Sequence, residues 1–168
     1  MNKLLTLIAL VCLGSLPSLA QTKDHVVQAM DNLLGGSWEL NGFWMDGNKF
    51  NQEFKFEKMG PSAYYVETFG NISKTGYETG LRNRGVRGWN DDEAMMKFSE
   101  IDVFGGITNG DVIIDGLDIL YTYEYGGQTL TDAWIYKGPD MYEFIIGVRG
   151  DNGQWSEIQL NGGCKRVR

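Results

Sequence analysis

The segment TKDHVVQAMDNLLGGSW, residues 22–38, decides the fold because it joins a short helical pattern to a Gly-x-Trp motif. Apolar residues recur at three- and four-residue steps from Val26 to Leu34, which predicts an amphipathic helix over residues 22–34. Thr22 is a suitable N-cap, and the glycine pair that follows Leu34 ends the helix. After Trp38 the periodicity changes to two, as is typical of strands. A short helix therefore leads into a domain made of strands.

Residues 1–20 are predicted to be a signal peptide that is cleaved near Ala20. Lys3 supplies a positive start, Leu4 to Leu13 form a short apolar stretch, and small residues precede the cleavage site. The apolar stretch is too short to span a bilayer, which needs about 20 residues. We expect an extracytoplasmic protein, periplasmic or secreted, with one domain over residues 21–168 and no integral membrane span.

Charge and cysteine content narrow the partners and the chemistry. The formal net charge is −7, from 22 acidic and 15 basic residues. Such a surface repels phosphate backbones, so nucleic acid is not an expected partner. Cys12 belongs to the predicted leader, which leaves Cys164 without an intramolecular disulfide partner. We expect Cys164 to be a small buried apolar residue.

The remainder of the chain has the pattern of an antiparallel meander. Apolar and polar residues alternate over residues 50–57, 119–125 and 142–149, which is typical of strands with one buried face. Asn-Gly and Asp-Gly pairs favour tight hairpins, and we expect turns at Asn41-Gly42, Asp46-Gly47, Asn109-Gly110, Asp115-Gly116, Asn152-Gly153 and Asn161-Gly162. This spacing predicts eight to ten strands. A β-sandwich is the alternative, but closure into an up-and-down barrel removes exposed edges, so we favour the barrel.

These features resemble the calycin superfamily. The stretch from Arg87-Gly88-Trp89-Asn90 through residues 101–105, followed by Trp134 and the terminal Lys165-Arg166, is similar to secreted bacterial lipocalin-like domains of unassigned function. In lipocalins a Gly-x-Trp opens the first strand after a short helix, and a basic side chain near the end of the barrel covers the indole. Gly36 and Trp38 match the first element, and Lys165, Arg166 or Arg168 could provide the cover. The resemblance implies that Trp38 is structural and that Thr131-Asp132 corresponds to a later lipocalin turn. It implies a fold and does not imply a ligand.

The sequence offers no convincing catalytic, cofactor or metal site. The single histidine, His25, lies on the predicted helix, far in sequence from Cys164, so neither a catalytic triad nor a histidine-ligated haem is expected. One His and one Cys do not make a zinc site. Acidic turns such as residues 91–93 could bind calcium, but solvated turns are the favoured interpretation.

Three arginines, Arg82, Arg84 and Arg87, form one basic cluster before Trp89. The favoured interpretation is that they are exposed and face neighbouring acids such as Glu78 and Asp91. The alternative is a loop at the barrel mouth that grips a carboxylate or phosphate.

The positive signal for function is aromatic. The chain has 5 Trp, 8 Tyr and 8 Phe, many of them on faces that alternation assigns to the interior. A barrel of this size can hold one small ligand, and tyrosine hydroxyls among apolar rings suit a flat apolar body with polar ends. The candidate ligand-binding residues are Phe54, Phe56, Met96, Phe98, Tyr121, Tyr123, Trp134, Tyr136 and Phe144.

We therefore expect a binding protein for a small hydrophobic or aromatic molecule. One alternative is a barrel enzyme that uses tyrosine, arginine and a carboxylate such as Glu67 or Glu124 for acid–base chemistry. The other is a cell-envelope interaction module whose interior is packed and holds no ligand. The faces of residues 63–69 and 154–160 are ambiguous in the sequence.

Overall fold

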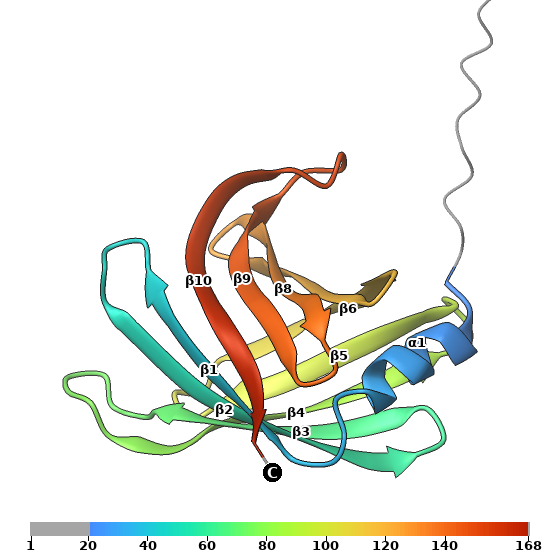
Figure 1. The fold of residues 1–168 in the computed structure, drawn as a ribbon, viewed down its shortest axis with the longest axis horizontal. Coiled ribbons are helices and arrows are strands. Elements are labelled where there is room, and N and C mark those ends of the chain that lie inside the picture. The colour runs from blue at the N-terminus through green and yellow to red at the C-terminus, as the bar shows by residue number, and fades with distance from the viewer. Residues whose placement is uncertain (1–20, 168) are drawn as a thin grey trace, which may run out of the picture.

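The computed structural model describes residues 21–167, which form one short helix and a closed antiparallel barrel (Figure 1). The predicted signal peptide, residues 1–20, lies outside the described residues, as does Arg168. The elements are α1 (Lys23–Asp31), β1 (Ser37–Trp44), β2 (Lys49–Gly60), β3 (Ala63–Asn71), β4 (Thr79–Asn90), β5 (Met95–Asp102), β6 (Ile107–Asp115), β7 (Asp118–Tyr125), β8 (Gln128–Gly138), β9 (Met141–Arg149) and β10 (Trp155–Val167).

Every strand pairs with its neighbours in the sequence, and β1 pairs with β10 to close the sheet. The prediction of an up-and-down barrel of eight to ten strands is thus confirmed. Along the strands, inward residues alternate with outward ones, and β3 shows this clearly: Tyr64, Val66 and Thr68 are buried, which settles the ambiguous face of residues 63–69.

The helix covers one end of the barrel, which we call the closed end. Thr22 caps α1 by accepting a hydrogen bond from the amide of His25 at 3.3 Å, as the sequence predicts. The apolar stripe of Val26, Met30 and Leu33 is fully buried against the barrel. Tyr64 Oη on β3 donates to Asp31 Oδ1 at 2.7 Å and fixes the end of the helix to the sheet. Helix packing therefore closes this end.

Trp38 joins the helix, the first strand and the last strand. Its ring is fully buried, and its Nε1 donates to the carbonyl of Leu33 at 2.9 Å. Trp38 and Arg166 are opposed on β1 and β10, and the guanidinium carbon lies 4.3 Å from the indole centroid. Arg166 also donates to the carbonyls of Asn32 and Leu34, which follow the helix. Arg166 is therefore the described candidate that covers the indole, whereas Arg168 lies outside the described residues.

The predicted turns are only partly correct. Asp46-Gly47, Asp115-Gly116 and Asn152-Gly153 lie in hairpins, and each of these glycines has a positive φ. Asn41-Gly42, Asn109-Gly110 and Asn161-Gly162 lie inside strands, so these three predictions are wrong. Gly42 faces Gly162 across β1 and β10, and a Cβ on Gly42 would lie 2.6 Å from the carbonyl oxygen of Asn161. These glycines allow a close backbone approach instead of a turn. Likewise, Thr131 and Asp132 lie within β8 and not in a turn.

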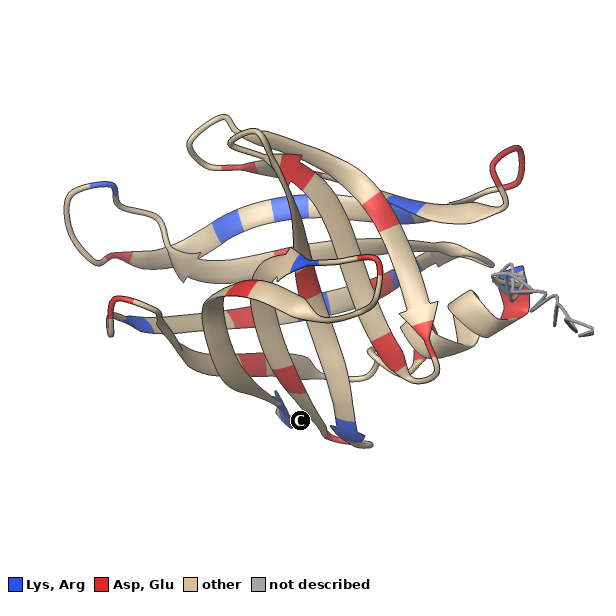
Figure 2. Cartoon of the chain, turned by 90° about the horizontal axis from the view of Figure 1, so that it is seen from above, with Lys and Arg blue, Asp and Glu red and all other residues tan. Residues whose placement is uncertain are grey.

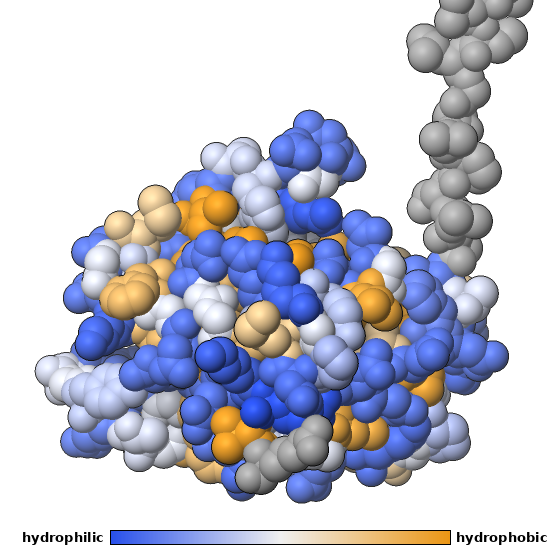
Figure 3. All heavy atoms as spheres, in the orientation of Figure 1, coloured by the Kyte–Doolittle hydropathy of each residue, from blue (hydrophilic) through white to orange (hydrophobic). Residues whose placement is uncertain are grey.

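Charged residues are spread over the strands and the hairpins (Figure 2), and acidic residues outnumber basic ones in the sequence. The outer surface in the view of Figure 3 is mainly hydrophilic, with separate hydrophobic patches. Within residues 21–167, no helix has the length and apolar character needed to cross a bilayer.

Candidate ligand-binding cavity

The barrel encloses a cavity of about 370 Å³ that extends from the interior toward the end opposite α1. We call that end the mouth; it is formed by the β1–β2, β3–β4, β5–β6, β7–β8 and β9–β10 hairpins. The lining residues are Trp44, Phe50, Gln52, Phe54, Phe56, Thr68, Arg82, Asn83, Arg87, Phe98, Glu100, Asp102, Thr108, Tyr121, Tyr123, Tyr125, Leu130, Asp132, Trp134, Phe144, Ile146 and Gln159. Cavities of this size hold small organic molecules.

One side of the cavity is a wall of aromatic rings centred on Trp134. Its indole makes edge-to-face contacts with Phe54 at 5.0 Å, Phe144 at 5.6 Å and Phe56 at 5.7 Å between centroids. Behind it, Trp38 and Tyr142 continue the ring cluster toward the closed end. Such contacts hold each ring in one orientation. The wall is therefore a rigid apolar surface.

The structure brings seven of the nine candidate ligand-binding residues to this cavity: Phe54, Phe56, Phe98, Tyr121, Tyr123, Trp134 and Phe144. Met96 and Tyr136 are not among the lining residues. Both lie next to the closed end, where Met96 is fully buried and Tyr136 packs on Tyr142 at 5.5 Å between centroids. They share the inward face but lie deeper than the cavity.

The opposite side carries a buried ion pair. Arg87 on β4 donates from Nη2 to Glu100 Oε2 on β5 at 3.0 Å, and only 6% of the arginine side chain is exposed. The guanidinium carbon lies 5.1 Å from the centroid of Tyr121 and 5.3 Å from that of Phe98. Burial opposes the charge, but Tyr121 and Glu100 outweigh burial and raise the pKa of Arg87. The guanidinium is therefore a permanent cation inside the barrel.

Several polar atoms along β4 lack partners. Within the described residues, the Nε and Nη1 atoms of Arg87 and the Oδ1 atom of Asn83 are buried and have no partner at hydrogen-bonding distance and angle; the Tyr121 hydroxyl interacts with the guanidinium without meeting that geometry. Gly85 lies between these two residues, and a Cβ there would be 2.6 Å from Nη1 of Arg87 and 2.5 Å from Cβ of Glu100. The absence of a side chain at Gly85 gives the ion pair its space. A buried donor without a partner costs about 1–3 kcal/mol, so these atoms need an explanation.

A second polar group lies on β8. Tyr123 Oη donates to Asp132 Oδ1 at 2.8 Å, and both side chains line the cavity. Burial raises the pKa of Asp132 to about 7, the charge of Glu100 adds to this, and the Tyr123 hydrogen bond and Arg87 oppose it. The side chain keeps some accessible surface because it faces the cavity. Asp132 is therefore a carboxyl group that titrates near neutral pH.

The two arginines that line the cavity do so because β4 contains a bulge. The β3–β4 register shifts between Thr68 and Phe69, so that Asn83 opposes Thr68 and Leu81 opposes Phe69. The shift lets both Arg82 and Arg87 face inward although their numbers differ in parity. The favoured prediction of exposed arginines is wrong for Arg87.

The other two arginines of the cluster differ from Arg87 and from each other. Arg82 lies near the mouth, where Nη1 donates to the carbonyl of Asn71 at 2.9 Å and the guanidinium stacks on Phe104. Arg84 points outward and pairs with Glu67 at 3.0 Å. The basic cluster of the sequence is thus divided between the cavity and the outer surface.

The acids named for the enzyme alternative do not lie in the cavity. Glu67 is on the outer face of β3 with Arg84 and Tyr65, and Glu124 is exposed beside Thr129. Sequence reasoning missed Glu100 and Asp132 as interior residues. The signal was present, because Glu100 continues the alternation of Met96 and Phe98, and Asp132 that of Leu130 and Trp134.

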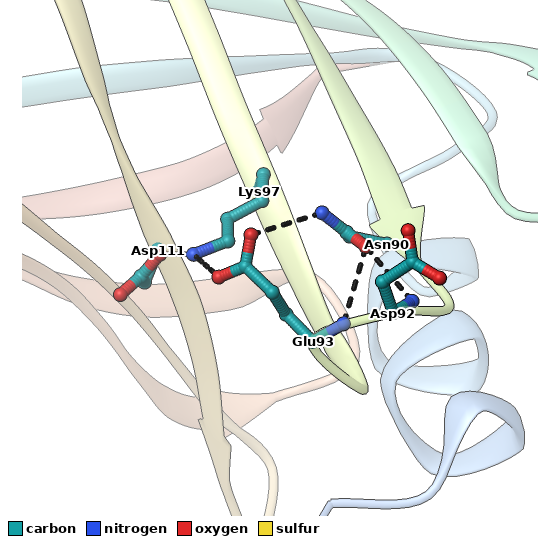
Figure 4. Close-up of polar contacts among 5 residues, drawn as sticks. All are labelled: Asn90, Asp92, Glu93, Lys97 and Asp111. Atoms are coloured by element: carbon teal, nitrogen blue, oxygen red, sulfur yellow. Dashed lines mark hydrogen bonds and ion pairs between the residues drawn. The ribbon is translucent and has the colours of Figure 1, made fainter.

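The acidic β4–β5 turn is a network of protein contacts (Figure 4). Asn90 Oδ1 accepts from the amides of Asp92 and Glu93, and Lys97 bridges Glu93 and Asp111. Among the described residues, no group of three or more His, Cys, Asp or Glu is arranged to hold a metal ion. The carboxylates of Glu93 and Asp111 are thus engaged with side chains of the protein itself.

His25 and Cys164 lie apart from the cavity. His25 Nε2 is 3.1 Å from the carbonyl oxygen of Gly116 at the closed end. Cys164 is fully buried, as predicted, and burial raises the pKa of its thiol to about 12. Such a thiol is protonated and unreactive at neutral pH.

No protein-family model and no curated protein matches this sequence. Solved structures do match. An S-type phycobiliprotein lyase from Guillardia theta is 12% identical over 88% of this chain and 98% of its own, with a TM-score of 0.51. A redesigned β-barrel is 16% identical over 83% and 96%, with a TM-score of 0.46. A third barrel, bound to DFHBI, is 16% identical over 84% and 99%, with a TM-score of 0.43. The lyase comparison supports the lipocalin-like fold, and fold alone.

Proposed function

We propose that this protein binds one small molecule with a flat apolar body and a polar end inside its barrel, and that it does so outside the cytoplasm. The observation that carries the proposal is the combination of an aromatic wall at Trp134 with unpartnered donors on Arg87, both facing a cavity of about 370 Å³. A packed interaction module would not need this volume. The resemblance to secreted lipocalin-like domains and the predicted leader support the location.

The two sides of the cavity fit the two parts of such a molecule. The rings around Trp134 offer an apolar surface, on which burial of a ligand contributes about 25 cal/mol per Å². Arg87, Glu100, Asp132 and Tyr123 offer donors and acceptors at fixed positions. A few placed polar groups in a mainly apolar cavity are typical of ligand sites.

The test uses N-phenyl-1-naphthylamine, an uncharged aromatic probe whose fluorescence rises in apolar surroundings. The wild-type protein is expected to bind it in the micromolar range. Ile146→Trp fills the cavity and should weaken binding at least tenfold, whereas Ile101→Trp makes the same change on an exposed outer position. Gln52→Trp, nearer the mouth, is the second filling variant, and circular dichroism checks that each variant folds.

The proposal fails if the wild-type protein does not bind the probe, or if both filling variants bind it as well as Ile101→Trp does. Native mass spectrometry of protein from its own host then identifies the natural ligand. A uniformly ligand-free chain there, together with no binding across a broad aromatic library, would also contradict the proposal.

An acid–base enzyme is the second candidate, because Asp132 titrates near neutral pH in a cavity that also holds Arg87. Asp132 would replace Glu67 and Glu124 as the proton-transfer group. A bound molecule whose mass changes on incubation with the wild-type protein, but not with Asp132→Asn, would favour the enzyme over the binder.

A further inference from the structure

The deep part of the cavity holds three ionisable side chains from three strands: Arg87 on β4, Glu100 on β5 and Asp132 on β8. Arg87 and Glu100 form an ion pair, and Asp132 interacts electrostatically with both. Tyr121 lies next to both Asp132 and Arg87. It is opposed to Asp132 in the β7–β8 register, and its ring faces the guanidinium of Arg87. The three groups therefore respond to one another's charge.

The unpartnered atoms in this region indicate which chemical group would suit the cavity. Nε and Nη1 of Arg87 are donors, and they are buried without an acceptor. A cationic ligand would leave both donors unpaired and would be repelled by the guanidinium. An oxygen acceptor would satisfy them, and an acidic oxygen group makes the strongest such bond with arginine.

An acidic group entering this region meets two protein carboxyls. If Glu100 and Asp132 are both ionised, the ligand becomes a third anion around one cation, which is unfavourable in a buried site. Glu100 is already paired with Arg87 at 3.0 Å. Asp132 accepts a hydrogen bond from the neutral Tyr123 hydroxyl and, among the described residues, forms no ion pair, so it is the carboxyl that a proton can neutralise.

Resting on the proposed function, we propose that the ligand carries an acidic oxygen group that binds Arg87, and that Asp132 takes up one proton from solvent when this group enters. The proton adds to the carboxylate of Asp132, and no other bond forms or breaks. The resulting carboxyl can also donate a hydrogen bond to the ligand.

Every charged or titratable group near Asp132 is consistent with this coupling. On β7, Tyr121 and Tyr123 are neutral phenols whose pKa values burial raises further. Across the cavity, Glu100 raises the pKa of Asp132 and Arg87 lowers it. On β9, the opposed residue Ile146 is apolar. Nearer the mouth, Arg82, Asp102 and Tyr125 also line the cavity.

The expected size of the effect follows from the fraction of Asp132 that is protonated before binding. With a pKa of about 7, the carboxyl is almost fully protonated at pH 5.5 and only about 3% protonated at pH 8.5. If the acidic ligand binds only the protonated form, its apparent affinity falls by up to about thirtyfold over this range.

The test compares two probes with the same aromatic body. 1-Anilinonaphthalene-8-sulfonate carries a sulfonate that stays ionised throughout, and N-phenyl-1-naphthylamine lacks it. In about 0.15 M salt, which screens the outer charges, the sulfonate probe is expected to bind ten- to thirtyfold more tightly at pH 5.5 than at pH 8.5. The uncharged probe should change less than twofold.

Variants and calorimetry test whether Asp132 is the group that takes up the proton. Asp132→Asn should bind the sulfonate probe equally at both pH values, whereas Glu124→Gln, an exposed acid-to-amide change on β7, should behave like the wild type. Titration calorimetry of the wild type at pH 8 in two buffers with different ionisation enthalpies should show uptake of nearly one proton with the sulfonate probe and none with the other. The calorimetry does not depend on whether the variant folds.

The inference is overturned if the sulfonate probe binds without proton uptake, if its pH dependence persists in Asp132→Asn, or if only the uncharged probe binds. The last result would leave the proposed function standing. Failure of both probes to bind would instead count against the proposed function itself.

Discussion

Replacement of Arg166 by Met is expected to open the closed end of the barrel and to destabilise the fold substantially. The guanidinium covers the Trp38 indole at 4.3 Å, donates to the carbonyls of Asn32 and Leu34, and pairs with Asp140 at 2.9 Å. Only 10% of the arginine side chain is exposed, so water does not replace these contacts easily. Methionine keeps the apolar stem and removes the charge and all donors.

The magnitude follows from the separate contacts. A cation over an indole contributes about 0.5–2 kcal/mol. A cation at the carbonyls that follow a helix contributes about 0.3–2 kcal/mol. The ion pair with Asp140, which is more than half exposed, adds less than about 1 kcal/mol. Since these contacts share one side chain and are not additive, the expected loss in the free energy of unfolding is about 2–4 kcal/mol.

Urea unfolding followed by tryptophan fluorescence measures this loss. The midpoint for Arg166→Met should fall by roughly 1–2 M. Lys165→Met removes a neighbouring exposed cation on the same strand and serves as the matched control. Hydrogen exchange of α1 should also accelerate in Arg166→Met only. If the two variants unfold within about 0.5 kcal/mol of each other, Arg166 does not hold the helix on the barrel and this reasoning is refuted.

Three further outcomes are expected. Gly85→Ala places a Cβ 2.5 Å from that of Glu100 and should lower the free energy of unfolding by about 1–3 kcal/mol in urea, whereas Gly88→Ala, on the same strand with no atom within 4 Å, should not. Tyr123→Phe removes the hydrogen bond that lowers the pKa of Asp132, so an NMR titration should find that pKa above its wild-type value. Because burial raises the pKa of folded Asp132 to about 7 from the ordinary 3.8, the folded state binds more protons between these values. The free energy of unfolding should therefore fall as pH rises from about 4 to about 7. In Asp132→Asn, the free energy of unfolding measured in urea should decrease less over the same pH range.

Much of the fold could be predicted because its signals are local. The N-cap at Thr22, the apolar stripe of the helix and the Gly-x-Trp all lie within 17 consecutive residues, and the structure confirms each of them. Alternation correctly assigned Phe54 and Phe56 to the interior because β2 keeps a regular register with β1 from Lys49 to Lys55 and with β3 from Glu53 to Lys58. Period-two patterns hold wherever a strand has no bulge.

Bulges explain much of what the sequence did not predict. In the β3–β4 pair, the register shift beside Phe69 brings Arg82 and Arg87 of β4 to the same face of the sheet. In a regular strand an even-numbered and an odd-numbered residue face opposite sides. On β10 the register shifts twice, between Trp155 and Glu157 and between Ile158 and Leu160. Gln159 consequently lines the cavity beside the fully buried Leu160. A bulge depends on pairing with the neighbouring strand, so one strand's sequence does not show it.

Alternation in the sequence also does not show how deep a residue lies along the barrel axis. Met96 and Tyr136 alternate correctly with their neighbours, but they lie level with α1 and are covered by it or by other rings. Asp132 and Glu100 were passed over because a charged residue in an alternating strand is ordinarily assigned to water. Their interior position is the feature that separates this barrel from a purely apolar one.

The interior position of these charged residues bears directly on why the barrel has a cavity. A buried ion pair such as Arg87–Glu100 contributes little net stability, because the cost of removing both charges from water offsets their attraction. Two unpaired arginine donors and an aspartate with a raised pKa make the empty state less stable still. Apolar side chains at the same positions, with a residue larger than glycine at Gly85, would fill the interior and remove all three costs. Under the proposed function, a ligand with an acidic oxygen group would satisfy the two unpaired arginine donors, and Asp132 would be neutralised by its proton. Binding of such a ligand is therefore expected to raise the free energy of unfolding.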